Sequence, residues 1–256
     1  ISKFAAMIHA VLIGAGNLAS HIYRAFAESD KLRFIQVYNR NLEHIDFVNS
    51  STAITNDIEQ LLEADIYFLC ISDSAIAEVS KNLNFTNRLT VHCSGASAMN
   101  ILSDKNRTGV FYPLQTFLKT SEVDFSGIPI CVEATNDKDK KLLLALGKEI
   151  SESVQEINSA QRAAIHVAAV FVNNFVNYLF QIGENLMEES QMDFSLLHPL
   201  IEKTVMSALQ DSPRNLQTGP AKRDDKGTIE KHLNQLTNQE QQNIYKTITN
   251  AILEQY

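Results

Sequence analysis

The first 157 residues alternate short apolar runs with amphipathic segments. The apolar runs predict strands at residues 7–14, 33–39, 64–72, 88–94, 108–114, 128–134 and 153–157. The segments between them predict helices at residues 17–28, 56–63, 74–82 and 137–150. Strands that alternate with helices are typical of a mostly parallel, doubly wound sheet with helices on both faces. We therefore predict an α/β domain over residues 1–157.

The pattern changes after residue 157, because no alternation of the β type returns. Helices are predicted at residues 160–188, 193–210, 228–235 and 238–254, with a polar connection at residues 211–227. We therefore predict a second, smaller, all-helical domain over residues 158–256. Its first helix would be about 43 Å long and is apolar around much of its circumference. We expect this helix to be buried between domains or between subunits.

Composition narrows the class of partner. The 256 residues are 45% hydrophobic and 20% charged, the balance of a soluble globular protein. A net charge of −8 without any basic run opposes binding to nucleic acid or anionic lipid. No stretch of about 20 residues lacks strongly polar groups, so we expect no membrane span, and the amino-terminal segment has no signal-peptide layout. We expect a cytoplasmic protein that binds a small molecule or a second copy of itself.

The cysteines predict neither a disulfide framework nor a metal centre. Cys70, Cys93 and Cys131 are far apart in the sequence, and none belongs to a Cys-x-x-Cys pair or a Cys/His metal pattern.

The segment "GAGNLA" follows the first predicted strand and opens the first predicted helix. In the spacing G-x-G-x-x-A, Gly14 permits a tight turn, Gly16 lets the backbone approach a pyrophosphate, and Ala19 lets the helix pack close to the sheet. The free N–H groups and the dipole of the helix N-terminus then attract the anion. We predict a Rossmann domain that binds the pyrophosphate through the backbone of Gly14, Gly16, Asn17 and Leu18. The alternative is an ordinary glycine turn.

The end of the second predicted strand indicates which dinucleotide binds. An acidic residue there would hold the ribose 2′-hydroxyl of NAD, but the chain reads "VYNR". A guanidinium with an amide suits a 2′-phosphate, so Asn39 and Arg40 favour NADP over NAD. In the alternative, Arg40 is a solvated loop residue and Glu43 binds the ribose.

Polar residues also follow the third and fourth predicted strands. Ser72 and Asp73 reach the carboxyl edge of the sheet, where ligands bind, and we place them beside the adenosine half or the bridge of the cofactor. They can equally cap the next helix, and the two roles are compatible.

The segment "VHCSGAS" lies at the same edge. We predict that Ser94 and Gly95 shape the nicotinamide end of the cofactor site, with His92 on the substrate side. A nucleophilic pair of Cys93 and His92 is disfavoured, because adjacent residues of a strand point to opposite faces.

Several separated motifs together resemble a known family. They are "VLIGAGNLA", "CISDSAI", "HCSGA", "YPLQTF", "IHVAAVFVNNF" and "LQTGPAKRDD". The chain resembles Rossmann-like proteins labelled putative NADP oxidoreductases, which are similar to pyrroline-5-carboxylate reductases and to 6-phosphogluconate and 3-hydroxyisobutyrate dehydrogenases. The resemblance covers nearly the whole chain. It implies a Rossmann domain, a helical domain that forms a homodimer, and a site in the cleft between the domains.

The most specific piece of the resemblance lies in the second domain, where Thr218, Arg223 and Asp225 would close the site. Arg223 either clamps an anionic substrate or forms a structural salt bridge with Asp224 or Asp225. The chain departs from the family pattern twice: Asp224 stands where glycine is expected, and Tyr112 stands where histidine is usual before "PLQTF". A role of that histidine does not carry over.

The stretch "HVAAVFVNNFVN" in the long predicted helix is apolar except for His166 and three asparagines. At about 100° per residue, Arg162, His166, Asn173 and Asn177 share one stripe, while Asn174 lies on its flank. The stripe either satisfies polar groups at a domain or subunit contact, or it lines the cleft. In the second interpretation, His166 is the acid or base and Asn173 orients the substrate; Asn174 and Asn177 are structural.

These observations favour an oxidoreductase that transfers a hydride between NADP(H) and a small organic substrate. The alternative is a non-catalytic NADP-binding sensor, in which the dinucleotide stabilises a dimer with a regulatory surface.

Overall fold

The computed structural model describes residues 7–256. The chain forms two compact units that divide between Val170 and Phe171, and each is described by itself. The last strand ends at Glu156, and the domain boundary placed near residue 157 stays a prediction.

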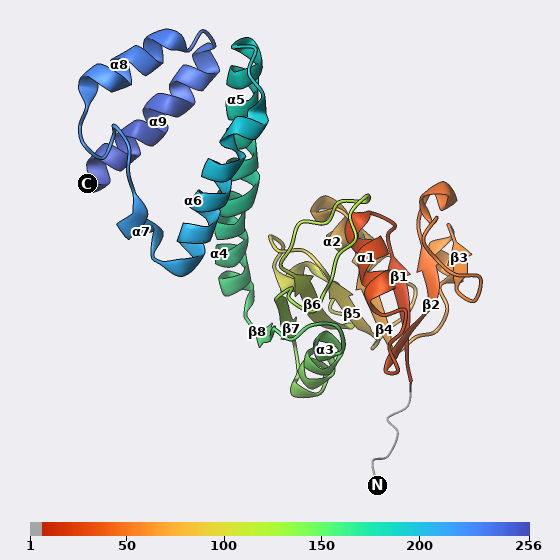
Figure 1. Ribbon diagram of the computed structural model, residues 1–256. Helices are drawn as coiled ribbons and strands as arrows, with labels where there is room; N and C mark the ends of the chain where they lie inside the picture. Colours follow the sequence, from red (N-terminus) through yellow and green to blue (C-terminus); the bar gives the residue numbers. More distant parts are fainter. Residues whose placement is uncertain (1–6) are drawn as a thin grey trace. The chain divides into compact units, whose positions relative to one another are not determined.

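The first unit contains an eight-stranded sheet (Figure 1). The strands are β1 (Ile8–Ile13), β2 (Leu32–Tyr38), β3 (Ala53–Thr55), β4 (Ile66–Leu69), β5 (Leu89–His92), β6 (Arg107–Pro113), β7 (Ile130–Ala134) and β8 (Val154–Glu156). They lie in the order β3-β2-β1-β4-β5-β6-β7-β8. Every neighbouring pair is parallel except β6 and β7. The mostly parallel Rossmann sheet predicted from the sequence is therefore confirmed.

All seven predicted strands form, and the sequence missed only β3 among the strands of the described chain. β3 has three residues at the edge of the sheet and pairs with β2 alone. A strand this short shows no measurable alternation of apolar and polar residues.

Helices pack on both faces of the sheet because the side chains of a strand alternate. Ala10 and Leu12 of β1 belong to the core beneath α1 (Asn17–Ala25) and α3 (Asp137–Ile150). Val11 and Ile13 belong to a second core on the opposite face, beneath α2 (Asp73–Lys81). These helices match the predicted segments 17–28, 137–150 and 74–82.

The predicted helix at residues 56–63 does not form; only a 3₁₀ turn, η2 (Ile58–Gln60), is present. The cause is Gln36, a buried residue of β2. Its amide donates to the carbonyl of Gln60 at 3.0 Å and accepts from the N–H of Leu62 at 2.8 Å. These bonds occupy backbone groups that a longer helix would need, and the chain is extended again at Leu61.

The long helix predicted at residues 160–188 spans Ser159–Glu189. It begins with a capping box formed by Asn158 and Gln161. It is not regular: α4 (Ser159–Ala169) is followed by a π-helical segment (Val170–Phe175) and then by α5 (Val176–Glu189). In a π segment each residue bonds five positions back, so the rotation per residue is smaller than in an α-helix. The angles calculated at about 100° per residue for Asn173 and Asn177 therefore do not apply beyond Val170, and the role of Asn173 beside His166 stays a prediction.

In an isolated chain, this helix exposes apolar side chains to solvent. Val172 is 75% and Phe171 61% exposed. By length and mean hydropathy (1.4) the helix could cross a membrane, although the sequence predicted no span. One such helix is weak evidence for a membrane protein, because a helix that packs against a second subunit has the same composition.

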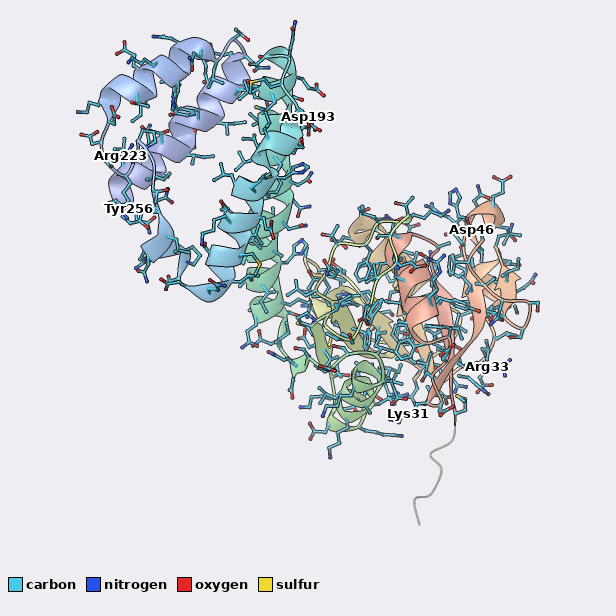
Figure 2. All side chains as sticks on the ribbon, in the orientation of Figure 1. Lys31, Arg33, Asp46, Asp193, Arg223 and Tyr256 are labelled. Carbon is cyan, nitrogen blue, oxygen red and sulfur yellow. The ribbon has the colours of Figure 1, made fainter. Side chains whose placement is uncertain are left out.

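The second unit is helical. After α5 come a 3₁₀ turn η5 (Phe194–Leu197), α6 (His198–Gln210), the short α7 (Pro213–Leu216), α8 (Lys226–Gln235) and α9 (Gln239–Gln255). Apart from α7, these helices follow the predicted segments. The hydroxyl of Tyr256, labelled in Figure 2, donates to the carbonyl of Arg214 at 2.5 Å and attaches the end of the chain to α7.

Candidate functional site

The sheet brings the glycine turn to the point where the strand order reverses. β1 pairs with β2 on one side and β4 on the other, so their carboxyl ends meet. The N–H of Gly14 donates to Tyr38 at the end of β2, and the N–H of Cys70 donates to Ile13, both at 2.8 Å. Ligands of open α/β sheets bind at such a switch point.

A pocket of about 620 Å³ opens there. Its lining includes seven of the ten residues predicted to bind the cofactor: Gly14, Gly16, Asn17, Leu18, Asn39, Arg40 and Ser72. Glu78 and Val79 of α2 and Asn82, which follows this helix, also line the pocket, and the sequence analysis did not single them out.

The two glycines have different tasks in this pocket. Gly14 has φ +115°, and a Cβ atom there would lie 2.2 Å from the carbonyl oxygen of Cys70. Gly16 precedes α1, and a Cβ atom there would meet nothing within 4 Å. No side chain caps α1, and its first turn has no acidic residue. The turn therefore leaves N–H groups and open space for an anion, which fits a pyrophosphate.

Arg40 is exposed at the rim of the pocket, and no ion pair within residues 7–256 involves it. Asn39 donates through its side chain to the carbonyl of Asn41 at 2.7 Å. Glu43 is not part of the lining, and its N–H bonds to the side chain of Asn41. The geometry thus favours Arg40 over Glu43 as the residue beside the ribose.

Ser72 and Asp73 begin α2, as the capping interpretation requires, yet the side chain of Ser72 caps no N–H group. It faces the pocket, whereas Asp73 is absent from the lining. The charge of Asp73 acts instead on the pKa values of His92 and Tyr112.

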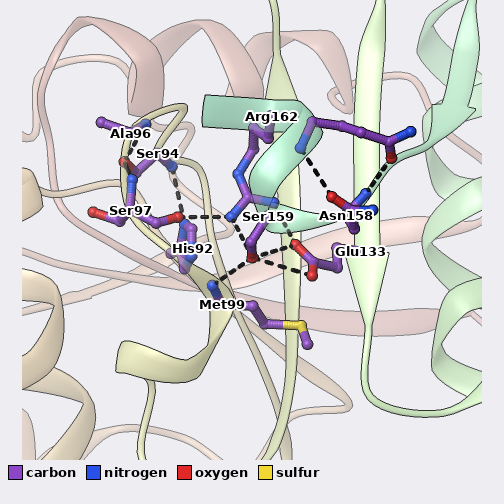
Figure 3. Close-up of polar contacts among 10 residues, drawn as sticks. His92, Ser94, Ala96, Ser97, Met99, Glu133, Asn158, Ser159 and Arg162 are labelled. Carbon is purple, nitrogen blue, oxygen red and sulfur yellow. Dashed lines mark hydrogen bonds and ion pairs between the residues drawn. The ribbon is translucent and has the colours of Figure 1, made fainter. Parts of the chain in front are cut away.

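The loop after β5 is built on His92 and Ser94 (Figure 3). Nδ1 of His92 accepts from the N–H of Ser94 at 3.1 Å, and Oγ of Ser94 accepts from the N–H groups of Ala96 and Ser97. His92 is 0% exposed. Burial and the charge of Arg162 lower its pKa to about 4, so the imidazole is neutral. This burial corrects the prediction for His92, which lies beneath the loop and not on its surface, whereas the place of Ser94 at the nicotinamide end stays a prediction.

Arg162 connects α4 to the sheet. Its side chain is 1% exposed and forms an ion pair with Glu133 of β7 at 2.5 Å. It also donates to the carbonyl of Ser97 at 2.6 Å and to Ser159 (Figure 3). Of the two interpretations of the polar stripe, the structural one applies to Arg162, because a buried guanidinium needs these partners.

Gly95, Tyr112 and His166 lie close to one another. The hydroxyl of Tyr112 lies 3.3 Å from Nδ1 of His166. A Cβ atom on Gly95 would lie 2.6 Å from that nitrogen and 2.6 Å from Cζ of Tyr112, so a larger residue here would displace at least one of the two rings. The sequence analysis missed Tyr112 as a site residue. The signal was its position on β6, two residues after Val110, on the face that packs against Ile165 of α4.

The residues predicted to close the site from the second domain lie in the second unit. Thr218 lines an apolar groove of about 280 Å³, and Arg223 is exposed (Figure 2). Asp225 caps α8 by accepting from the N–H and the hydroxyl of Thr228, which lowers the pKa of its carboxyl. Asp224 pairs with Lys226 at 3.6 Å. No ion pair of Arg223 is present among the described residues, so of its two interpretations the structural salt bridge does not form.

Asp224 has φ +49°. This backbone conformation favours glycine and is tolerated by aspartate, which explains both the glycine expected here and the residue found.

Within residues 7–256, no basic group activates the thiol of Cys93. This thiol is buried, lies 3.4 Å from the thiol of Cys70, and has a pKa raised by burial. A thiol of this kind is not a nucleophile at neutral pH. The sequence analysis also disfavoured a nucleophilic pair of Cys93 and His92.

Comparison with known proteins identifies the family. A solved structure described as a putative NADP oxidoreductase from Bacteroides fragilis is 34% identical, with 97% of this chain and 98% of that chain covered and a TM-score of 0.89. The chain belongs to this family. The model of DUF2520, a domain of unknown function, matches residues 128–252. None of the curated proteins compared matches the sequence.

More distant structures share the fold. A protein from Thermotoga maritima is 19% identical over 96% of this chain and 97% of its own, with a TM-score of 0.72. The pyrroline carboxylate reductase of Plasmodium falciparum, solved with NADP bound, is 13% identical over 97% of this chain and 100% of its own, with a TM-score of 0.55. These two structures therefore share the Rossmann fold with a carboxyl-terminal helical domain.

Proposed function

We propose that the protein is an NADP-dependent oxidoreductase that transfers a hydride between NADP(H) and a small organic substrate. The pocket at the switch point carries this proposal, because the glycine turn, the open N-terminus of α1 and Arg40 all line it. The membership of the family supports it, since the relative from Bacteroides fragilis is described as an NADP oxidoreductase.

Different residues of the pocket would bind different parts of the cofactor. The backbone of Gly14, Gly16, Asn17 and Leu18 would bind the pyrophosphate. Arg40 with Asn39 would bind the 2′-phosphate through charge-assisted hydrogen bonds. When bound, the nicotinamide would donate or accept the hydride. The chain itself would supply the proton, through His166 as acid or base with Asn173 orienting the substrate.

Arg40 tests the choice of cofactor. Replacing it with alanine removes the only cation that lines the pocket in the described chain. We expect Arg40→Ala to weaken NADPH binding by tenfold or more while NADH binding stays within about twofold, as measured by calorimetry. Lys119→Ala, an exposed cation outside this pocket, is the control. Equal NADPH and NADH affinities before and after the change would contradict a 2′-phosphate site.

Turnover separates the enzyme from the non-catalytic sensor, since both bind the cofactor. Imines, 2-oxo acids and aldehydes would be screened for oxidation of NADPH, and hydroxy acids for reduction of NADP. The enzyme requires that at least one class reacts and that His166→Ala abolishes the reaction while NADPH still raises the melting temperature.

We also propose that the protein is a homodimer whose helical parts form the interface, with a cleft site that Thr218, Arg223 and Asp225 help to close. The exposed apolar face of the long helix supports this, because water-exposed patches of this kind mark interaction surfaces. Light scattering is expected to report a dimer for the wild type and a monomer for Val172→Asp. Leu118→Asp changes an apolar residue of similar exposure in the first unit and should leave the dimer intact.

A further inference from the structure

Tyr112 and His166 form a pair that the sequence did not predict. The two rings pack edge to face with their centres 6.3 Å apart, and the hydroxyl oxygen of Tyr112 lies 3.3 Å from Nδ1 of His166. Tyr112 is 9% exposed and held on β6 opposite Cys131 of β7. His166 is half-buried, and no hydrogen bond among residues 7–256 uses its Nε2 atom. One imidazole nitrogen is therefore held by the protein, and the other is free to meet a ligand.

The pair lies at the same edge of the sheet as the dinucleotide pocket. Gly95, on which a Cβ atom would lie 2.6 Å from both rings, belongs to the loop after β5 at the carboxyl edge of the sheet. Two strands away along the same edge, β1 ends in the glycine turn of the dinucleotide pocket. This arrangement is typical of a general acid, because a second group orients the ring that transfers the proton.

Burial raises the pKa of Tyr112, so its hydroxyl keeps its proton and does not become a competing base. The neighbouring Arg162 is already paired with Glu133, and His92 is neutral. The phenolic oxygen of Tyr112 can then accept a hydrogen bond from an N–H group on Nδ1.

We propose that Tyr112 is a positioning residue that keeps a proton on Nδ1 of His166, so that Nε2 is the atom that exchanges a proton with the substrate. The inference rests on the proposed oxidoreductase function. In the reducing direction, the C–H bond of the reduced cofactor that supplies the hydride would break and a C–H bond on the substrate would form, while the N–H bond at Nε2 of the imidazolium breaks. The proton goes to the substrate oxygen or nitrogen, and His166 is left neutral with its remaining proton on Nδ1. Solvent then restores the imidazolium.

Nitrogen NMR of the protein without cofactor tests the tautomer directly. A free neutral imidazole in water favours the proton on Nε2, so we expect His166 of the wild type to show the unusual Nδ1–H form. Tyr112→Phe, which removes only the hydroxyl, should shift His166 toward Nε2–H. Tyr245→Phe is the matched control, because Tyr245 lies 2.8 Å from Nδ1 of His232 in the second unit. That variant should leave His166 unchanged.

Kinetics then test the consequence. With a substrate in hand, we expect Tyr112→Phe to lower kcat by about tenfold or more while KM stays within about threefold, because the hydroxyl orients the acid rather than the substrate. A wild-type His166 in the Nε2–H form, or one unchanged by Tyr112→Phe, overturns the proposal. An Nδ1–H tautomer in a protein that oxidises no NADPH with any substrate class would instead contradict the proposed function.

Discussion

Arg162 and Glu133 form a buried ion pair of 2.5 Å that joins the first turns of α4 to β7. Both charges lie where water cannot solvate them well, so each depends on the other. The pair attaches the first turn of the helix that bears His166 to the sheet, and it is the first target for a stability test.

Breaking this pair is expected to destabilise the first unit strongly. Arg162→Met would leave the carboxylate of Glu133 buried without its partner, at a cost of roughly 3–5 kcal/mol in the free energy of unfolding. Urea unfolding measures it. Lys119→Met, which breaks an exposed pair with Asp46, should cost at most about 1 kcal/mol. Similar losses for the two variants would show that Arg162 is solvated.

The low pKa of His92 predicts a pH dependence of stability. The folded state binds its proton only near pH 4, while the unfolded state binds it near pH 6.5. Between these values the unfolded state holds more protons, so stability is full above about pH 6.5 and falls as the pH drops toward 4, by roughly 3 kcal/mol from this group.

Urea unfolding at several pH values measures this effect against His92→Asn, which keeps an acceptor for the N–H of Ser94 but does not titrate. The variant should lose less stability than the wild type between pH 7 and pH 4. Parallel curves for the two proteins would refute the assignment to His92.

Alanine at the two glycines of the turn should separate folding from binding. Gly14→Ala should lower the free energy of unfolding by about 1–3 kcal/mol, because φ is +115° and the methyl group would meet Cys70. Gly16→Ala should leave stability unchanged and weaken NADPH binding by tenfold or more, since its methyl group would occupy the space left for the pyrophosphate. Thermal melts and calorimetry measure the two effects.

Gly127→Ala is the control, because its methyl group also meets open space but lies outside the pocket. It should change neither quantity. Undiminished NADPH binding by Gly16→Ala would place the pyrophosphate elsewhere.

The positive φ of Asp224 predicts an order of stability. Asp224→Gly should be more stable than Asp224→Ala by about 1 kcal/mol, because alanine pays for the left-handed conformation. At Asp211, with φ −143°, glycine should have no such advantage over alanine. Chemical unfolding of the four variants decides, and an alanine variant at 224 as stable as the glycine variant would exclude strain there.

Much of the fold was predictable, because the physical causes are local. Alternating side chains of β1 face two cores, and the glycine spacing of the first turn follows from backbone sterics at one strand end. The same locality explains the limits. The helix predicted at residues 56–63 is absent because Gln36, distant in sequence, takes its backbone groups. The stripe on the long helix was calculated for 100° per residue, and the π segment changes that rotation.

By itself, the sequence determined the Rossmann sheet, the helical second part, the glycine turn and the candidates at the strand ends. Only the tertiary structure decided which of these candidate residues lie close together. It placed His92 beneath a loop, gave Arg162 a buried partner in Glu133, and brought Tyr112 to His166. The reason is that a pattern of residues specifies which face a side chain occupies, whereas contacts between residues 54 positions apart depend on how strands and helices pack.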